Sequence, residues 1–302
     1  MDADLDTLAT ALYVRADDLL KAHPAVVPAR PLVGIAPKLS DAELITLAVM
    51  QVLLQVNGEA RWVRYAHAHL GHLFPYLPNQ SGYNKRLRRL GDAMALLIRV
   101  LARSTSVWTD DVWVADSTPI ECARSRETVH RSELAGFAEY GYCASHSRYF
   151  WGLRLHLVAT LHGLPVGIAI TGAKADERAV LLDLLTDPGL TRSTRQTLIA
   201  DKNYHGRDFE TALAATGINL LRPTRKGETP RPGQRFFKPL RQTVESIFDT
   251  AKDQLGLEHH GGRTPIGVLV RILQRLLALT ATIWHNDQTG APIRRSLTPY
   301  DH

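Results

Sequence analysis

Hydrophobic periodicity changes character about a third of the way along the chain. In the first hundred residues, apolar positions recur every three or four residues, the spacing of one face of an α-helix. The segment 40–56 begins with Ser40 and has Glu43 three residues later, a capping-box pattern ahead of an apolar run. Further helices are expected over 59–74 and 84–104, with a turn between them. This region is therefore predicted to be all helical.

Beyond this region, short apolar runs bounded by turn residues predict β-strands, which alternate with stretches of helical periodicity. Strands are expected over 112–120, 151–163, 164–172, 197–201 and 218–223, the second and third forming a hairpin around His162-Gly163. Helices are expected over 176–185, 206–217, 239–255 and 265–285. This order is typical of a mixed α/β sheet with helices packed against it.

The change in pattern predicts two domains. Residues 1–105 are expected to form a helical domain, and residues 106–302 an α/β domain that includes a basic loop over 222–241. The last long helix carries Arg271 and Arg275 one turn apart, which favours an amphipathic core helix over a membrane span. The acidic N-terminus lacks the basic-then-apolar pattern of a leader peptide. A cytoplasmic protein with no membrane partner is expected.

Positive charge is concentrated in two places. The net charge is +6, and the segment 222–241 alone holds seven cationic residues and one acidic residue. A second cluster lies in the helical domain, where a helix-turn-helix could present it to DNA. Its members are Lys85, Arg86, Arg88 and Arg89. Either cluster alone is compatible with a solvated surface, but two together favour a partner with a phosphate backbone.

Three carboxylates are placed where a site could form. Asp116 and Asp201 each follow an apolar run at an expected strand end, where ligand groups gather in α/β sheets. Glu245 lies on the expected helix 239–255, beside its apolar stripe. Such a set of oxygen ligands suits Mg²⁺ or Mn²⁺, and two such ions promote in-line displacement at phosphorus.

Each carboxylate also has a simpler interpretation. Asp116 and Asp201 are also compatible with turn formation, and Glu245 with a salt bridge to Arg241 four residues earlier. Asp249 lies one turn further along the same helix and competes with Glu245 for the role of third ligand.

The wider pattern resembles a known family. Arg241, Glu245 and Lys252 match the R-(3)-E-(6)-K signature of bacterial insertion-sequence transposases, and DKNYHG at 201–206 is similar to the motif around their second aspartate. Together with Asp116, these residues resemble the DDE triad of an RNase H-like transposase. The resemblance covers residues 110–302 and is greatest to the insertion sequence 982 family.

One position departs from that pattern. The fuller signature has a tyrosine three residues before the arginine, and this chain has Lys238 there. The metal ligands are unaffected, but any DNA contact made by that tyrosine cannot be carried over.

The resemblance implies an RNase H-like catalytic domain that cuts DNA at the ends of its element and transfers the freed 3′ hydroxyl to target DNA. Two Mg²⁺ ions, which Mn²⁺ can replace, would be held by Asp116, Asp201 and Glu245. The partners would be the terminal inverted repeats and target DNA, bound by a homodimer or larger assembly at the bacterial nucleoid. The expected DNA contacts are Arg241, Lys252, Tyr204, Lys238, Arg235, Lys85, Arg86, Arg88 and Arg89.

Other functions remain open. The chain could be a transposase relic that binds DNA without cutting it, or an RNase H-like nuclease with no joining step. For Tyr204, a packed core aromatic is as compatible with the sequence as contact with a phosphate or a displaced base.

Overall fold

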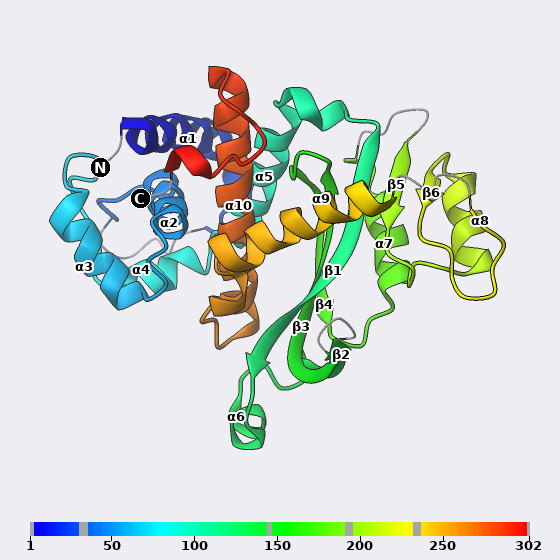
Figure 1. Ribbon diagram of the computed structural model, residues 1–302. Coiled ribbons are helices and arrows are strands. Elements are labelled where there is room, and N and C mark those ends of the chain that lie inside the picture. The colour runs from blue at the N-terminus through cyan, green and yellow to red at the C-terminus, as the bar shows by residue number, and fades with distance from the viewer. Residues whose placement is uncertain (1–2, 30–35, 144–146, 191–195, 232–236, 301–302) are drawn as a thin grey trace. The chain divides into compact units, whose positions relative to one another are not determined.

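The structure is a computed structural model that describes residues 3–29, 36–143, 147–190, 196–231 and 237–300. The chain divides into two compact units. One combines Met1–Thr105 with Ala251–His302, and the other is Ser106–Thr250. We refer to them as the helical unit and the sheet unit (Figure 1).

The helical unit is built from long helices. They are α1 (Ala3–Ala22), α2 (Asp41–Leu53), α3 (Glu59–His69), α4 (Gln80–Leu87), α5 (Gly91–Arg103) and α10 (Pro265–Thr289). The predicted capping box is confirmed, with the Glu43 amide donating to Ser40 Oγ at 3.0 Å. The helix expected over 84–104 is instead two helices, because the chain turns through short-range bonds such as Leu90 N–H to Leu87 O. That turn buries both leucines.

The C-terminal helix α10 packs against α1, α2 and α5. The sequence placed this segment in the α/β domain, whereas Ala251–His302 clusters with the N-terminal helices. The difference arises because α10 is apolar around most of its circumference and needs helices on several sides to cover it. By length and composition α10 could also cross a membrane, and 83% of its most apolar window is buried inside the protein.

Both arginines of α10 are buried within this packing. Arg271 pairs with Glu59 and donates to Gln274 Oε1 at 3.0 Å, while Arg275 donates to the Gly256 carbonyl at 2.9 Å. Burial lowers the pKa of each guanidinium to about 10. The polar partners make these arginines part of the interior and not of a solvated face.

The sheet unit holds six strands. They are β1 (Val112–Ala123), β2 (Glu139–Cys143), β3 (Arg148–Thr160), β4 (Pro165–Gly172), β5 (Thr197–Ala200) and β6 (Asn219–Leu221). Its helices are α6 (Arg126–Arg131), α7 (Glu177–Leu185), α8 (Arg207–Ala215) and α9 (Phe237–Asp249). All five predicted strands are present, whereas β2 and α6 had not been predicted. The Asp176 side chain caps α7 by accepting from the Arg178 amide at 2.9 Å.

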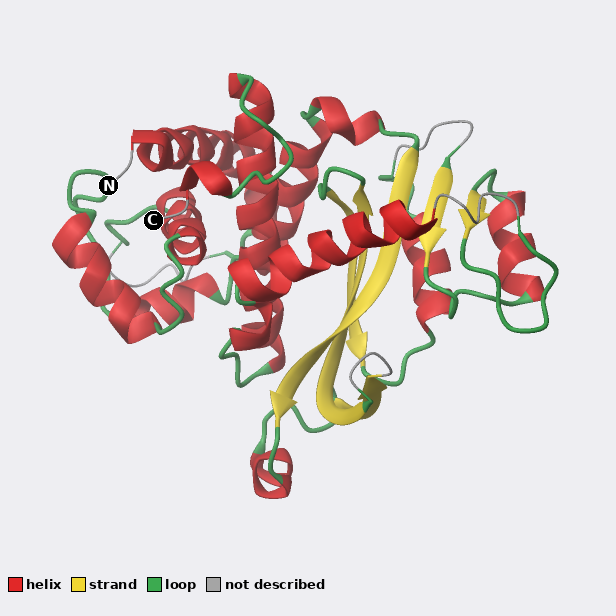
Figure 2. Ribbon diagram, in the orientation of Figure 1, coloured by secondary structure: helices red, strands yellow, loops and turns green. Residues whose placement is uncertain are grey.

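The strand order is β2-β3-β1-β5-β6, and β4 also pairs with β3. The pairs β1–β3, β2–β3 and β3–β4 are antiparallel, and the pairs β1–β5 and β5–β6 are parallel. The hairpin from β3 to β4 turns at Gly163, whose φ of 85° suits glycine. Helices α7 and α8 provide the crossovers to β5 and β6. This mixed arrangement is consistent with the predicted RNase H-like α/β fold (Figure 2).

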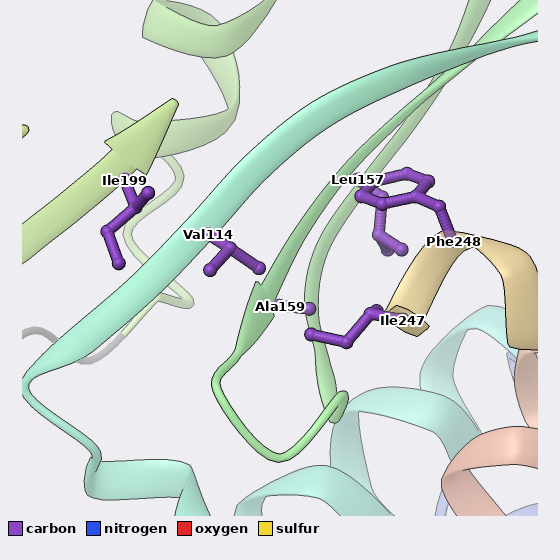
Figure 3. Close-up of a cluster of buried hydrophobic side chains, with 6 residues drawn as sticks. All are labelled: Val114, Leu157, Ala159, Ile199, Ile247 and Phe248. Atoms are coloured by element: carbon purple, nitrogen blue, oxygen red, sulfur yellow. The ribbon is translucent and has the colours of Figure 1, made fainter. Parts of the chain in front are cut away.

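Helix α9 lies across one face of this sheet (Figure 1). Ile247 and Phe248 project from it into a buried cluster with side chains of three strands, and Phe248 lies beside Leu157 (Figure 3). The strand members of the cluster are Val114, Leu157, Ala159 and Ile199. Burying two large apolar side chains contributes on the order of 3–6 kcal/mol to holding α9 on the sheet.

The backbones of β1 and β3 approach closely at Gly152. A β-carbon there would collide with the carbonyl oxygen of Ile120, next to a register shift between Glu121 and Ala123. Only glycine leaves room for this approach.

We therefore expect Gly152→Ala to lower the free energy of unfolding by about 2–3 kcal/mol, since backbone has to move to admit the methyl group. Gly71→Ala is the matched control, because a β-carbon at Gly71 meets no atom within 4 Å. Urea unfolding followed by tryptophan fluorescence would measure both. Equal midpoints for the two variants would contradict the close approach.

Candidate functional site

Two of the predicted carboxylates occupy neighbouring positions in the sheet. The parallel pairing of β1 with β5 ends at Ala115 opposite Ala200. Asp116 directly follows Ala115, and Asp201 directly follows Ala200. Because neighbouring strands lie about 4.8 Å apart, the two aspartates are close together. Asp116 had been expected at a strand end, but it lies within β1, which continues to Ala123 against β3. What ends before Asp116 is the pairing of β1 with β5, whereas β1 itself continues.

Asp116 belongs to the face of the sheet that α9 covers. Successive side chains of a strand alternate between faces, so Asp116 shares the face of Val114, whereas Asp201 lies just beyond the end of β5, two residues after Ile199. Asp116 also lies opposite Leu157, a member of the same cluster. Both aspartates are partly exposed. The pair supplies the hard oxygen ligands that Mg²⁺ prefers, and thus fits a divalent cation.

The third predicted ligand, Glu245, is exposed on α9 three residues before the buried Phe248. In the described part of the chain, no three His, Cys, Asp or Glu side chains are arranged to hold a metal ion. The structure thus brings Asp116 and Asp201 together, but it does not assemble them with Glu245 into one metal-holding group. The choice of Glu245 over the equally exposed Asp249 stays a prediction.

The chain turns sharply after β5. Asp201 accepts from the Asn203 backbone amide at 2.7 Å and from its side-chain amide at 3.0 Å. Tyr204 follows and is only 2% exposed, with its ring centroid 6.3 Å from that of Phe209. Of the two interpretations of Tyr204 that the sequence allowed, its position agrees with the packed core aromatic. In this position the ring has no exposed face on which a base could stack.

Tyr204 nevertheless lies in the electrostatic environment of the site. Burial raises its pKa well above the usual value, and the negative charges of Glu177, Asp116 and Asp201 raise the pKa further. Arg154 opposes them and lowers the pKa. The phenol is therefore un-ionised at neutral pH and does not act as a base.

Arg154 links several elements around the site, a role that was not predicted from the sequence. From β3 its guanidinium donates to Glu177 Oε1 at 2.6 Å, to Ser117 Oγ at 3.0 Å and to the Tyr142 carbonyl at 3.2 Å. Its side chain is 11% exposed. Arg154 thus connects the start of α7, strand β2 and the residue that follows Asp116. An arginine inside a predicted strand could have suggested a buried partner, but not which one.

His156 is a second buried group beside the site. It lies opposite Ser117, is 2% exposed, and its Nε2 is 2.9 Å from Thr171 Oγ1. Its Nδ1 has no hydrogen-bond partner among the described residues. Burial, followed by the charge of Arg154, lowers the pKa of His156 to about 4. The imidazole is therefore neutral under physiological conditions.

The predicted DNA contacts near Glu245 are placed only in part. Lys238 and Arg241 lie in α9, and Lys252 lies in the π-helical turn Thr250–Gln254 that follows it. Arg235 falls outside the described residues. A single α-helix had been expected over 239–255, and α9 ends at Asp249 instead.

Two arginines of the basic loop have acidic partners within the sheet unit. Arg222 is 2% exposed and binds Glu210 at 2.8 Å and Glu228 at 2.7 Å. Arg231 also pairs with Glu210. Hydrogen bonding to Arg222 lowers the pKa of Glu228 to about 2. These two arginines therefore fasten the start of the loop to α8, whereas Arg225 is exposed.

The basic cluster of the helical unit likewise contains both cations that bind groups of the protein and cations that are exposed. Arg86 binds Asp41 at 2.6 Å, and Arg89 donates to the backbone carbonyls of Pro28 and Ala29 at 2.8 and 2.9 Å. Lys85 and Arg88 are exposed. Only these last two present their charge freely enough to serve as the predicted phosphate contacts.

Comparison with known proteins identifies the class. The sequence matches the family described as Transposase DDE domain over residues 108–281, which is more than half of the chain and includes all three predicted ligands. The chain belongs to this family, whose members generally use divalent metal ions. A search of curated proteins finds no match.

A solved structure with a similar fold is described as the cryo-EM structure of the piggyBac transposase synaptic complex with hairpin DNA. The TM-score is 0.53 at 8% sequence identity, and the similarity covers 96% of this chain and 76% of that one. At this identity the likeness concerns the fold, and it agrees with the RNase H-like arrangement of the sheet.

The ion pairs of the basic loop predict that Arg222→Met lowers the free energy of unfolding by about 3 kcal/mol, because two carboxylates lose their buried partner. Arg225→Met is the matched control and should change stability by no more than about 0.5 kcal/mol. Chemical denaturation of both variants tests this. A stable Arg222→Met protein with weakened DNA binding would instead make Arg222 a DNA contact.

The low pKa of His156 predicts a specific pH dependence of stability. The unfolded chain protonates this side chain near pH 6.5, and the folded protein only near pH 4. Stability from this group is therefore complete above pH 6.5 and is lost as the pH falls towards 4, by about 3 kcal/mol in all. Urea unfolding at several pH values should show this loss in the wild type and not in His156→Gln. Parallel pH profiles for the two proteins would rule it out.

Proposed function

We propose that this protein is the DNA transposase of an insertion sequence, which cuts phosphodiester bonds at the ends of its element and joins the freed 3′ hydroxyl to target DNA. The observation that supports this most is the register of β1 and β5, which sets Asp116, on the face covered by α9, beside Asp201. Membership of the Transposase DDE domain family supports the same reaction class.

The proposed roles follow from position. Asp116, on β1 just past the end of its pairing with β5, would be a ligand of both metal ions, while Asp201 and Glu245 would each complete the ligand set of one. Bound Mg²⁺, or Mn²⁺ in its place, supplies the charge that stabilises the attacking and leaving oxygens during in-line displacement. The Asn203 amides, which donate to Asp201, fix that carboxylate in the turn after β5.

The two steps share one geometry. In the first, water attacks the phosphorus at the element end, the bond to the 3′ oxygen breaks, and that oxygen leaves as a 3′ hydroxyl. In the second, this hydroxyl attacks a phosphodiester of target DNA, forms a new oxygen–phosphorus bond and expels another 3′ hydroxyl. No covalent link between protein and DNA is needed. Arg241 and Lys252 would hold phosphates during both steps.

The proposal also covers the transposase family, the cellular location and the assembly state. The sequences of residues 141–171 and 294–302 are similar to those of the insertion sequence 982 family, and a bacterial, cytoplasmic enzyme acting on DNA at the nucleoid is inferred from that similarity. The structural neighbour described as a synaptic complex with hairpin DNA supports DNA as the partner. A homodimer or larger assembly on paired ends is proposed for the same reason.

The test uses the DNA that flanks the gene as substrate for purified protein with Mg²⁺, and maps strand breaks at nucleotide resolution. Wild type is expected to cut at matched positions on either side of the gene. Glu245→Gln should lose cutting by at least about a hundredfold, because a transition-state charge loses its support. Asp249→Asn, equally exposed on the same helix, is the matched control and should cut normally.

Three results would change the proposal. Loss of cutting in Asp249→Asn, with Glu245→Gln active, would move the third ligand one turn along α9. Specific binding to the flanks without cutting in Mg²⁺ or Mn²⁺ would identify a DNA-binding relic. Cutting without any joined product would identify a nuclease.

A further inference from the structure

Exposed aromatic side chains gather on strand β2 and the beginning of β3. Tyr140 is 52% exposed, Tyr142 48% and Tyr149 78%, and Phe137 just before β2 is 61% exposed. Tyr142 and Tyr149 lie opposite each other, with ring centroids 5.1 Å apart. Large exposed aromatic groups are unfavourable in water and usually mark a binding surface. We call Tyr140, Tyr142 and Tyr149 the tyrosine strip.

The tyrosine strip is on the same face of the sheet as Asp116. Paired residues of antiparallel strands share a face, so Tyr142 lies with Tyr149. Alternate residues of a strand also share a face, so Tyr149 and Leu157 of β3 lie on the same face. Leu157 lies opposite Asp116. The strip is therefore a continuation of the face on which the chemistry is proposed.

The separation along the strand suits a nucleic acid. Eight residues from Tyr149 to Leu157 span roughly 26 Å at about 3.3 Å per residue. At the B-DNA rise of about 3.4 Å per base pair, this is the length of about seven or eight base pairs, and fewer nucleotides of an extended single strand span it. One DNA strand cut beside Asp116 could therefore also reach the tyrosine strip.

The position of the strip favours DNA over a second copy of the protein, because the strip continues the face of the sheet that carries Asp116. Arg148 directly precedes Tyr149 on β3, so its side chain lies on the opposite face. Arg148 and Arg124 contact the carboxylate of Glu121 at 3.8 and 3.3 Å. Their side chains are 43% and 81% exposed, so they bring positive charge to the end of the sheet at which the strip lies.

We propose that the tyrosine strip binds unpaired nucleotides of the DNA substrate by stacking its rings on their bases. Tyrosine rings stack on any exposed base face, and the bases of intact duplex have no such face available. The strip would hold strand separated from its partner near the cut, while Arg124 and Arg148 attract its phosphates. This inference rests on the proposed transposase function for its substrate.

The experiment measures binding of the full chain to fluorescein-labelled (dT)20 and to a 20-base-pair duplex, in EDTA so that no cutting occurs. The double variant Tyr142→Leu/Tyr149→Leu is expected to bind (dT)20 at least about tenfold more weakly than wild type, with duplex affinity unchanged. The double phenylalanine variant keeps the rings and should bind like wild type. Tyr13→Leu, at an exposed tyrosine of the helical unit, controls for loss of surface area.

Several outcomes would overturn the inference. Unchanged (dT)20 binding in the leucine variant would exclude stacking, and an equal loss for (dT)20 and duplex would exclude a preference for unpaired bases. A shift of the leucine variant from dimer to monomer in sedimentation, with unchanged DNA binding, would make the strip an interface between copies. Because binding is measured without metal, it remains informative even if no cutting is ever observed.

Discussion

The short parallel pairing of β1 with β5 is the contact on which the proposed site depends. Only four residues of each strand pair, yet the last pair, Ala115 with Ala200, determines that two carboxylates follow side by side. A slip of one residue would turn one aspartate to the opposite face of the sheet. The apolar cluster under α9 opposes such a slip, because the slipped strand would withdraw its own apolar side chain, Val114 on β1 or Ile199 on β5, from the cluster.

Much of the sheet could be predicted from sequence because its strands are apolar and bounded by turns. Strand β2 was missed because its sequence, EYGYC, alternates tyrosine with glutamate, glycine and cysteine and has no apolar run. The break between α4 and α5 was missed for a different reason, since helical periodicity continues across the turn at Leu87 and Leu90. Asp116 and Asp201 could be proposed from their positions after apolar runs, but their proximity depends on a register that no local pattern encodes.

Charge was the least predictable property. Counting cations identified two basic segments, but it could not show that Arg222 is buried between Glu210 and Glu228, or that Arg86 binds Asp41. Glu210 and Asp41 lie on other elements, so only the folded chain separates structural arginines from available ones. The same holds for Arg154, whose contacts come from three elements of the sheet unit.

Strands β2 and β4 lie end to end along the same edge of β3, since β2 pairs with it as far as Gly152 and β4 begins its pairing at Leu153. The chain between β1 and β3 is therefore an excursion that extends the sheet without taking part in the β1–β5 register. Such an excursion can diverge in length and composition between related proteins while Asp116 and Asp201 keep their positions. Evolution could thus alter the proposed binding surface on β2 without disturbing the residues proposed to cut DNA.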